Sequence, residues 1–278
     1  MARSELPPRP DPLPIALVDN HTHLDSVRSD APGLEVSEAI AAAAAVGVDR
    51  VVQIGCEVES ARSSVVMAHT HPQVLAGVAL HPNEAPRLAA LGELDAAYAV
   101  IGALALDPRV RTVGETGLDY YRTGPEGREI QHDAFRWHIA LAKELDLPLQ
   151  IHDRDAHEDV LAVLDEVGAP RHTVMHCFSG DARFARACVE RGFFLSYAGP
   201  VTFKNNHALR DAVAVTPLEQ LLIETDAPYL TPHPWRGAVN SSYLLPVTAR
   251  VVAGVAGVSV VELAQEVSAT AERLYGPW

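Results

Sequence analysis

The chain has 278 residues, of which 48% are hydrophobic, and it carries a formal net charge of −14. This length is close to the roughly 250 residues of a single α/β barrel domain, and the apolar content suffices for a large core. The acidic balance excludes a protein that coats nucleic acid without sequence preference, because such proteins are basic. It leaves open an enzyme that holds phosphates through metal ions and a few local arginines.

The first 14 residues contain five prolines and lack the apolar centre of a secretory signal, so we expect a disordered leader there. No run of about 18 apolar residues occurs, so no membrane span is expected. The three cysteines, Cys56, Cys177 and Cys188, lack C-x-x-C spacing, which indicates neither a disulfide framework nor a zinc knuckle. A reducing cytoplasm is therefore the expected location.

Residues 15–278 are predicted to form a single domain in which short β-rich runs alternate with longer helical patterns. The predicted strands are Ala16–Asn20, Arg50–Cys56, Val74–Leu80, Val110–Glu115, Leu149–His152, Thr173–His176, Phe193–Ser196 and Gln220–Thr225. The predicted helices include Val36–Val46, Ser60–Thr70, Gly127–Leu145, Ala156–Val167, Asp181–Glu190, His207–Ala214, Tyr243–Ala253 and Val260–Leu274. Such alternation predicts βαβ units and a parallel sheet.

Eight βαβ units of about 25 to 30 residues each favour a closed (β/α)8 barrel, the TIM barrel, within the α/β class. The structural alternative is an open doubly wound sheet, but no G-x-G-x-x-G motif follows the first strand. We find neither a second domain nor an internal repeat in the sequence.

Two histidines, His21 and His23, stand two residues apart where the first strand ends. Residues i and i+2 of a strand point to the same face, so both imidazoles can be aimed at one point. That arrangement suits a metal ion, although two loop histidines without a ligand role are the plain alternative.

Further ligand types follow the later strands, at the end where barrel enzymes carry their active sites. These residues are Glu115 at the end of the fourth strand, His152 at the end of the fifth, His176 at the end of the sixth and Asp226 at the end of the eighth. With the first pair, they make four histidines and two carboxylates, which is a ligand set for two divalent ions. Each residue could instead sit singly in a hydrogen-bonded loop, but six coincidences on one face make that reading weak.

The motifs around these residues resemble the TatD family of metal-dependent deoxyribonucleases, within the amidohydrolase superfamily. The resemblance runs from about His21 to Asn240 and follows the family's order. It rests on the H-x-H pair, G-E-T-G-L-D-Y at 114–120, I-H-D-R-D-A at 151–156, H-C-F-S-G at 176–180, T-F-K-N at 202–205 and E-T-D-A-P-Y-L at 224–230. Together these motifs are highly specific, although none is specific alone.

The resemblance implies that one metal is held by His21, His23, Glu115 and Asp226, and the second by Glu115, His152 and His176. Related barrel hydrolases often bridge their metals with a carboxylated lysine. Here the only lysines, Lys143 and Lys204, do not end strand four, so we expect Glu115 to bridge the ions. The native ions are expected to be Mg²⁺, Mn²⁺ or Zn²⁺.

One segment departs from the family pattern. The family's segment after the eighth strand reads R-G-x-x-N-E-P. This sequence matches it from Arg236 to Asn240, but has Ser241 and Ser242 in place of the last two residues. The departure bears on substrate contacts near this loop and leaves the predicted metal ligands unchanged.

The expected chemistry is two-metal phosphodiester hydrolysis, with Asp226 and Glu115 as the catalytic residues. Asp226 would accept a proton from the attacking water. Substrate contacts are expected from Arg154, Lys204 and Arg236, because guanidinium forks in particular match phosphate oxygens, although each could instead be a solvated loop charge. His81, at the end of the third strand, could contact the substrate or support a ligand. Tyr120 and Tyr121 are candidates for stacking on a base.

Three classes of function follow from this pattern. The first is a deoxyribonuclease that prefers single strands or frayed ends. The second is a metal-dependent hydrolase of a small ester, lactone or amide at the same site. The third, a non-catalytic metal-binding scaffold, is disfavoured because a closed structural site does not need six ligands. We expect DNA as the substrate, no membrane, no stable protein partner and a monomer.

Overall fold

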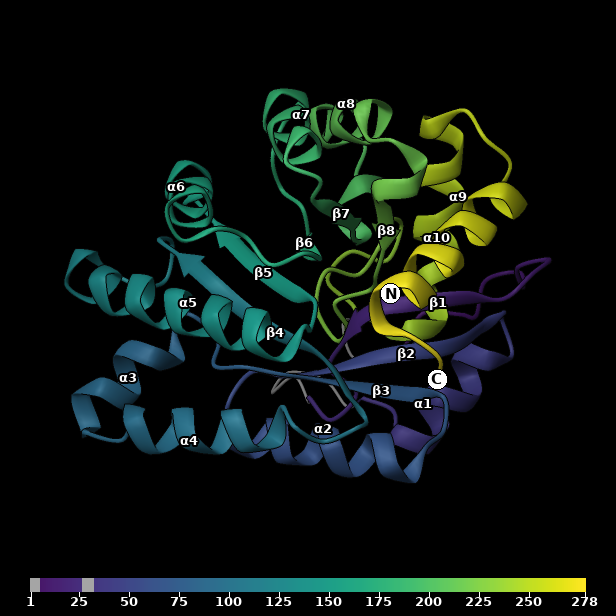
Figure 1. Ribbon diagram of the computed structural model, residues 1–278. Helices are drawn as coiled ribbons and strands as arrows, with labels where there is room; N and C mark the ends of the chain where they lie inside the picture. The colour runs from purple at the N-terminus through teal and green to yellow at the C-terminus, as the bar shows by residue number, and fades with distance from the viewer. Residues whose placement is uncertain (1–5, 27–32) are drawn as a thin grey trace. The chain divides into compact units, whose positions relative to one another are not determined.

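The computed structural model describes residues 6–26 and 33–278, in which parallel strands alternate with helices (Figure 1). The strands are β1 Leu17–Thr22, β2 Val48–Gly55, β3 Val74–Val78, β4 Val110–Asp119, β5 Leu149–Arg154, β6 Thr173–Met175, β7 Phe194–Tyr197 and β8 Leu221–Ile223. The α-helices are α1 Val36–Ala44, α2 Val58–Thr70, α3 Glu84–Leu91, α4 Leu94–Leu104, α5 Pro125–Leu145, α6 His157–Val167, α7 Ala182–Glu190, α8 His207–Val215, α9 Leu245–Ala256 and α10 Val260–Tyr275. Short 3-10 helices are η1 Gly199–Thr202, η2 Leu218–Gln220 and η3 Ser242–Leu244. The strand order of the sheet follows the chain, from β1 to β8.

Each predicted strand corresponds to one observed strand, but the ends differ where they matter for function. β1 continues through His21, and β4 runs on to Asp119, four residues beyond the predicted end at Glu115. Helices α3 and α4 were not predicted. Pro86 in the first turn of α3 and the left-handed Gly92 at its end interrupt the apolar periodicity from which a helix is recognised.

Residue contacts divide the described chain into two compact units. The terminal unit comprises residues 6–26, 33–53 and 180–278, and the central unit comprises residues 54–179. The predicted organisation as a single domain stays a prediction.

In the terminal unit, β1 pairs with β2 and β7 pairs with β8, both in parallel. The segment after β8 binds the end of β1 through two backbone hydrogen bonds. Asp226 N–H donates to the His21 carbonyl at 3.0 Å, and His23 N–H donates to the Ala227 carbonyl at 2.8 Å. These bonds set the positions of three predicted metal ligands.

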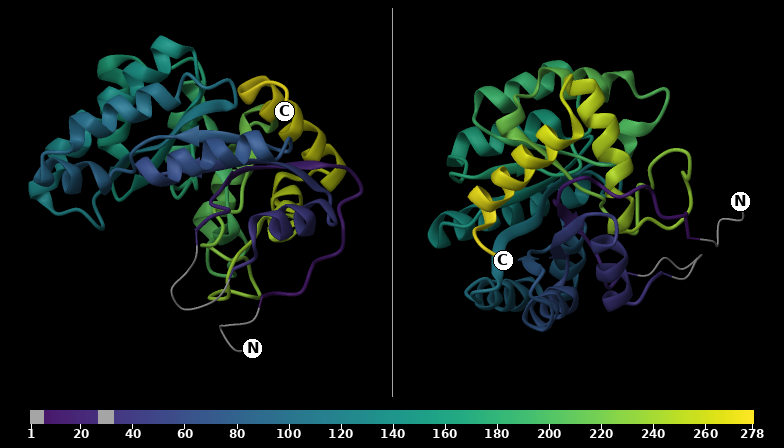
Figure 2. Two further views of the ribbon diagram at one scale, coloured as in Figure 1. Left: turned by 90° about the horizontal axis from the view of Figure 1, so that it is seen from below. Right: turned by 90° about the vertical axis from the view of Figure 1, so that its right-hand side faces the viewer.

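Helices α9 and α10 pack against each other in the terminal unit, and Figure 2 shows them side by side in both views. Ser259 caps α10, because its side chain accepts a hydrogen bond from Glu262 N–H. Among residues 6–26 and 33–278, no single helix is long and apolar enough to cross a membrane. The run Ser242–Ala256 meets that test only together with α10, at a bend of 105°.

The N-terminal segment differs from its prediction. Residues 1–5 of the expected leader lie outside the described residues, but residues 6–14 make specific contacts. The Tyr243 hydroxyl donates to the Pro7 carbonyl at 2.6 Å, and Arg250 donates to the Asp11 carbonyl at 2.7 Å. Leu13 is buried and binds the Val46 carbonyl through its N–H. Prolines stiffen this segment, so contacts with its carbonyls cost little conformational entropy.

In the central unit, β3, β4, β5 and β6 pair in parallel. The long helix α5 begins with Pro125 and buries Phe135, Ile139 and Ala142 on the stripe that faces β4. Gly117 pairs with His152, and a Cβ added at Gly117 would lie 2.1 Å from the His152 carbonyl oxygen. Only glycine therefore lets β5 approach β4 closely enough to place His152.

Candidate metal centre

The terminal unit brings together His21, His23 and Asp226, and we call this group the terminal cluster. The two imidazole Nε2 atoms lie 3.3 Å apart, and His23 Nε2 lies 3.3 Å from Asp226 Oδ1. His21 Nε2 lies 3.9 Å from the same carboxylate oxygen. Asp226 has a left-handed backbone with φ of 52°, which is uncommon for a residue other than glycine. The two backbone bonds between this loop and β1 hold it in that conformation.

A buried carboxyl group supports the terminal cluster from within β1. Asp19 is fully buried and accepts hydrogen bonds from Thr225 N–H at 2.9 Å and from the Thr225 hydroxyl at 2.6 Å. Burial raises the pKa of Asp19 to about 7, although hydrogen bonds from Thr225 and Ser242 oppose the rise. Asp19 therefore ties β1 to the loop that presents Asp226.

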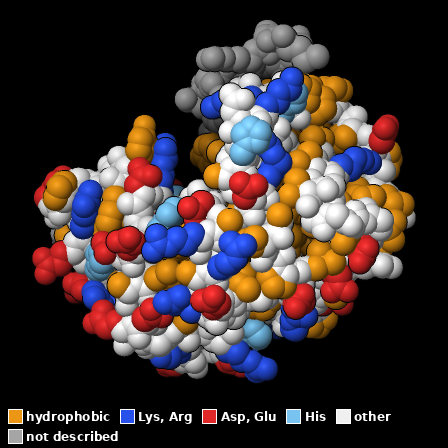
Figure 3. Space-filling view, turned by 90° about the horizontal axis from the view of Figure 1, so that it is seen from above, with side chains coloured by type: hydrophobic (Ala, Val, Ile, Leu, Met, Phe, Trp, Pro, Cys, Tyr) orange, Lys and Arg blue, Asp and Glu red, His pale blue; other side chains and the backbone are white. Residues whose placement is uncertain are grey.

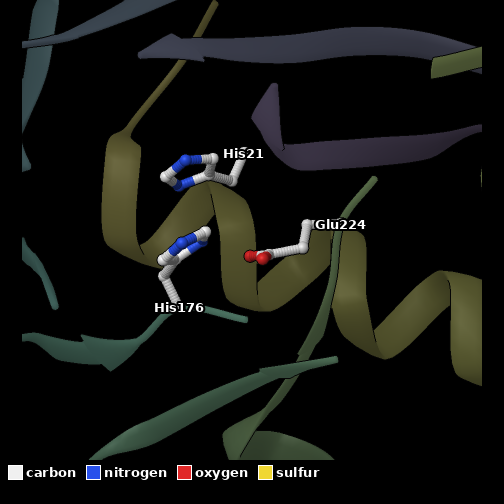
Figure 4. Close-up of side chains that lie close together, drawn as sticks. All are labelled: His21, His176 and Glu224. Atoms are coloured by element: carbon white, nitrogen blue, oxygen red, sulfur yellow. The ribbon is translucent and has the colours of Figure 1, made fainter. Parts of the chain in front are cut away.

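Glu224 is a second buried carboxyl group in the terminal unit, and it follows β8 directly. Figure 4 shows its side chain directed toward His21, and the two residues offer ligand atoms within 4.8 Å of each other. Asn240 steadies this loop, because its side-chain amide donates to the Thr225 and Tyr229 carbonyls at 2.8 Å and 2.6 Å. Asn240, the last residue of the R-G-x-x-N run, thus has a structural role here.

The central unit brings together Glu115, His152 and His176, and we call this group the central cluster. Glu115 Oε1 lies 2.5 Å from His152 Nδ1 and 3.2 Å from His176 Nε2. His81 Nε2 lies 3.6 Å from the same oxygen, while Cys56 Sγ donates to the other oxygen, Oε2, at 3.4 Å. One buried carboxylate therefore contacts three imidazoles and a thiol.

The electrostatics of the central cluster follow from these contacts. Burial works to raise the pKa of Glu115, but attraction from His176, His81 and His152 outweighs it and holds this pKa well below its usual range. Burial works to lower the pKa of His152, but Glu115 and Asp119 raise it to about 9. Burial dominates at His81 and lowers its pKa to about 4. The cluster is an ion-pair network centred on Glu115.

The far nitrogen of His152 has its own carboxylate. Asp119 Oδ2 lies 3.5 Å from His152 Nε2 and accepts a hydrogen bond from the Asn83 side chain at 2.9 Å. Its other oxygen accepts from the N–H groups of Tyr121 and Arg122 at 3.0 Å and 2.8 Å. A carboxylate behind a ligand histidine fixes the tautomer and orientation of the ring.

The predicted substrate contacts lie in both units. In the central unit, the Arg154 guanidinium lies 3.9 Å from the centre of the exposed Tyr121 ring. In the terminal unit, Arg236 is exposed, and its guanidinium lies 4.8 Å from the centre of the Phe203 ring. Phe203 is followed in the chain by Lys204, which is also exposed. Tyr120, the other residue predicted to stack on a base, instead donates a hydrogen bond from its hydroxyl to Asp159 at 2.6 Å.

Both clusters have donor sets that fit a divalent cation. In the terminal cluster two imidazole nitrogens and one carboxylate oxygen lie within 4.8 Å of one another, and the same is true of the central cluster. Mixed imidazole and carboxylate sets bind Zn²⁺ and Mn²⁺, and carboxylates also suit Mg²⁺. His81, Asp119 and His152 form a further group that meets the same distance. The structure thus brings the predicted ligands together within each unit, and the bridging role of Glu115 stays a prediction.

Sequence reasoning did not assign Asp19, Asp119 or Cys56 to the site. Asp19 and His21 stand two residues apart in β1 and His23 comes just after its end, so Asp19 could have been found from the same period of two. Asp119 falls beyond the predicted end of β4, and Cys56 meets Glu115 across 59 residues of sequence. No local pattern signals such contacts.

Eight strands in chain order that alternate with helices, and His–carboxylate clusters beside strand ends, are the features expected of a metal-dependent enzyme of the barrel type. A family model described as TatD related DNase matches residues 18–276. A protein of Mycobacterium tuberculosis named an uncharacterized metal-dependent hydrolase, TatD, is 46% identical over 265 residues, which cover 94% of this chain and 98% of that protein. The chain belongs to the TatD family of metal-dependent hydrolases.

Other relatives agree with this assignment. The uncharacterized metal-dependent hydrolase YabD of Bacillus subtilis is 38% identical over 260 residues, which cover 93% of this chain and 98% of that protein. The crystal structure of YJJV, a TatD homologue of Escherichia coli, has a TM-score of 0.82 at 26% identity and covers 93% of this chain and 97% of that chain. The predicted (β/α)8 fold class is thereby confirmed.

Proposed function

We propose that the protein is a deoxyribonuclease that hydrolyses phosphodiester bonds with two divalent ions, Mg²⁺, Mn²⁺ or Zn²⁺. The observation that carries the proposal is the pair of His–carboxylate clusters, each beside the carboxyl ends of parallel strands. Membership of a family described by its DNase activity supports the choice of DNA over other esters. Bound divalent ions would lower the pKa of water and offset the charge of the phosphate.

Two carboxylates of the protein would transfer the proton and hold the ions. The Asp226 side chain is 13% exposed and rests on His23, so it is placed to accept a proton from an attacking water. Glu115 is more deeply buried, at 6% exposure of its side chain, and serves to hold charge rather than to exchange protons with solvent. We assign proton transfer to Asp226 and ion binding to both carboxylates.

The phosphate would be positioned by a small number of cations. Arg154 is ordered by its stack on Tyr121, and Arg236 by its stack on Phe203, so both guanidinium edges remain available for phosphate oxygens. His81 offers a further donor: its Nδ1 accepts from Asn83 N–H at 3.1 Å, which leaves the ring proton on Nε2, toward Glu115.

The distribution of charge favours substrates with accessible ends. Figure 3 shows basic and acidic side chains interspersed on the face viewed, and the net charge of the chain is −14. A long duplex would be repelled by this net negative charge, whereas a single strand or a frayed end needs only local contacts. We propose that these are the preferred substrates, that cleavage proceeds stepwise from ends, and that the enzyme acts as a cytoplasmic monomer.

The test uses end-labelled oligonucleotides as single strands, blunt duplexes and frayed duplexes, together with a closed circular duplex. Each is incubated with the metal-loaded enzyme beside a panel of small esters, lactones and amides. Faster release from single or frayed ends than from the circle supports the proposal. Turnover of a small ester or lactone without any cleavage of DNA would replace it with the second class of function.

Two variants connect any observed cleavage to the site. Asp226→Ala should remove it, while Asp211→Ala, an exposed carboxylate on α8, should leave it unchanged. Cleavage that survives Asp226→Ala would indicate a contaminating nuclease or a different site.

A further inference from the structure

A histidine of α5, His138, bonds to two strand ends of the central unit, and its side chain is fully buried. Its Nε2 accepts a hydrogen bond from Leu80 N–H at 3.0 Å, and its Nδ1 lies 3.0 Å from the Thr116 hydroxyl oxygen. Leu80 directly precedes His81 in the chain, and Thr116 directly follows Glu115. His138 therefore binds the chain neighbours of two side chains that meet in the candidate metal centre.

His138 supplies an acceptor at a point where the pairing of β3 with β4 has ended. The backbone N–H groups on both sides of Leu80 donate toward β2, to the carbonyls of Gly55 and Cys56 at 3.1 Å and 2.8 Å. Alternate N–H groups of an extended chain point to opposite sides, so Leu80 N–H points toward β4. Within the described residues, the register of β3 with β4 ends before this point, at Val78. The imidazole of His138 thus replaces a strand carbonyl as the partner of Leu80.

The orientation of the His138 ring follows from its bonds and its neighbours. Because Nε2 accepts from Leu80 N–H, the proton of the neutral ring is on Nδ1, which lies 2.7 Å from the Ala134 carbonyl. The Trp137 ring meets the imidazole at an interplanar angle of 88°, with 4.8 Å between the ring centres. Burial lowers the pKa of His138 to about 4, so the ring is neutral near pH 7 and Nε2 remains an acceptor.

The bond to Leu80 bears on where the next side chain, His81, can lie. Bonds to the segment after β2 hold one side of this part of the chain, and His138 holds the other. In this position His81 Nε2 lies 3.6 Å from Glu115 Oε1, and its ring centre lies 4.5 Å from that of His152. Without an acceptor, the buried Leu80 N–H would be left unpaired, which is costly enough to favour a shift of the backbone. Such a shift would carry His81 away from the carboxylate.

We propose that His138 is a positioning residue that acts through His81 and holds the His81 ring against the Glu115 carboxylate of the central cluster. The inference rests on the metal centre of the proposed function but not on DNA as the substrate. His81 directs its Nε2 proton toward a carboxylate that would bind an ion, and partners of this kind fix the orientation of metal ligands. His138 supports the ion at one remove, through the backbone of Leu80.

The experiment is a double-mutant cycle between His138→Asn and His81→Ala in the full-length protein. Competition titrations with a chromophoric chelator measure Zn²⁺ affinity, so the result does not depend on the identity of the substrate. Each single variant should weaken one bound ion by at least about tenfold, the lower end of what losing a supporting partner costs a metal site. The double variant should lose no more than His81→Ala alone, because the two residues act in series.

The matched control is His138→Gln. The longer side chain of glutamine brings an amide oxygen to the place of Nε2, where it can accept from Leu80 N–H, whereas the amide of asparagine is too short to reach it. Both substitutions remove the aromatic ring, so a role in packing alone would give similar losses in both. We expect His138→Gln to restore most of the Zn²⁺ affinity that His138→Asn loses.

Three outcomes of the titrations would overturn the role of His138. They are additive losses in the double variant, equal losses in His138→Asn and His138→Gln, and wild-type affinity in His138→Asn. A wild type that binds no Zn²⁺ at all would overturn the metal centre as well. Circular dichroism of each variant verifies that it is folded.

Two measurements on the wild type keep the proposal testable if a variant does not fold. Long-range proton–nitrogen NMR spectra of histidine-labelled protein should place the His138 proton on Nδ1. Hydrogen exchange of the Leu80 amide should be slow, because its bond is buried. A proton on Nε2, or rapid exchange at Leu80, would show that the bond on which the proposal depends is not formed.

Discussion

The terminal and central clusters hold similar ligands by different means. In the terminal cluster, backbone hydrogen bonds between β1 and the loop after β8 place His21, His23 and Asp226. In the central cluster, contacts of one side chain, Glu115, with His152 and His176 define the geometry. The central cluster thus adds a shared charged partner to the backbone pairing that places His152, whereas backbone bonds predominate in the terminal cluster.

This difference has consequences for how each cluster responds to change. Removing a side chain from the terminal cluster leaves its backbone frame intact, so the loss should concern chemistry more than stability. Removing Glu115 takes the shared partner from three imidazoles and a thiol, and buried polar groups without partners are costly. The two clusters can therefore be distinguished by the balance of activity and stability that each substitution costs.

The largest expected effect is on catalysis. Asp226→Ala and Glu115→Ala should each lower kcat/KM for single-stranded DNA by at least about a hundredfold, in the range by which positioned acid–base groups accelerate reactions. Thermal unfolding of the same variants distinguishes the clusters, because Glu115→Ala should lower Tm more than Asp226→Ala. Near wild-type turnover in either variant would refute the assigned roles. Glu144→Ala on the exposed side of α5 is the matched control.

Metal removal should abolish activity and reveal how many ions bind. Exhaustive chelation should eliminate hydrolysis, and adding Mg²⁺, Mn²⁺ or Zn²⁺ should restore it, since mixed imidazole and carboxylate sets leave the choice of metal to supply. Metal analysis of His23→Ala and His176→Ala should each find about one ion fewer than in the wild type. Full activity in protein verified as metal-free would exclude this chemistry.

The close approach of β4 and β5 offers a test of the central unit alone. Gly117→Ala should destabilise the protein by at least about 2 kcal/mol, because the added Cβ meets the His152 carbonyl and φ is +136°. Gly254→Ala, in α9 with nothing within 4 Å of the added Cβ, should stabilise it by about 0.5–1 kcal/mol. Urea unfolding of both variants measures the contrast. Unchanged stability of Gly117→Ala would show that β5 can move away without cost.

The ends of strands were the part of the site most accessible to sequence analysis. A period of two identified His21 and His23, and an apolar run followed by a polar residue identified Glu115 and His152. The contact of Cys56 with Glu115 depends on tertiary packing and has no local signal. Asp119 was not recognised because Gly114 and Gly117 weaken the strand pattern that leads to it.

For the fold as well, features that follow from local sequence could be predicted, and features that depend on tertiary contacts could not. Alternation of strands and helices predicted the barrel, since each element follows from its own periodicity. The contacts of residues 6–14 could not be predicted, because polar and proline-rich composition resembles that of a disordered segment until a partner such as Tyr243 supplies hydrogen bonds.

A buried histidine of the central unit makes stability depend on pH. His138 accepts from Leu80 N–H at 3.0 Å and lies 2.7 Å from the Ala134 carbonyl, so it is held neutral. Burial lowers its pKa from 6.5 to about 4. Because the unfolded chain takes up this proton at higher pH, the stabilisation is complete above pH 6.5 and is lost as the pH falls toward 4.

The measurement compares wild type with His138→Gln by urea unfolding of metal-free protein at pH 7 and pH 5. His138→Gln should be the less stable protein at pH 7, and its deficit should shrink by about 2 kcal/mol at pH 5. A deficit that is the same at both values would mean that His138 titrates alike in the folded and unfolded states.

The smallest expected effect concerns which cations contact the phosphates of the substrate. If Arg154 in the central unit and Lys204 and Arg236 in the terminal unit supply the phosphate contacts, few counterions are released on binding. With a slope of about −0.7 per contact for single strands, three contacts give a plot of log(kcat/KM) against log salt no steeper than about −2.

Alanine at any one of these three positions should flatten that slope by about 0.7, and equal changes in both units would show that both contribute phosphate contacts. Lys143→Ala is the matched control, because Lys143 lies in the last turn of α5 and donates to the Val167 carbonyl at 2.9 Å. It should leave the slope unchanged. A much steeper wild-type slope would mean that further basic residues contact DNA, so that the binding surface is larger than these three residues. Faster cutting within closed circular duplex than at strand ends would also indicate such a larger surface. A slope altered only by Arg154→Ala would assign the phosphate to the central unit, where the ion-pair network around Glu115 already concentrates charge.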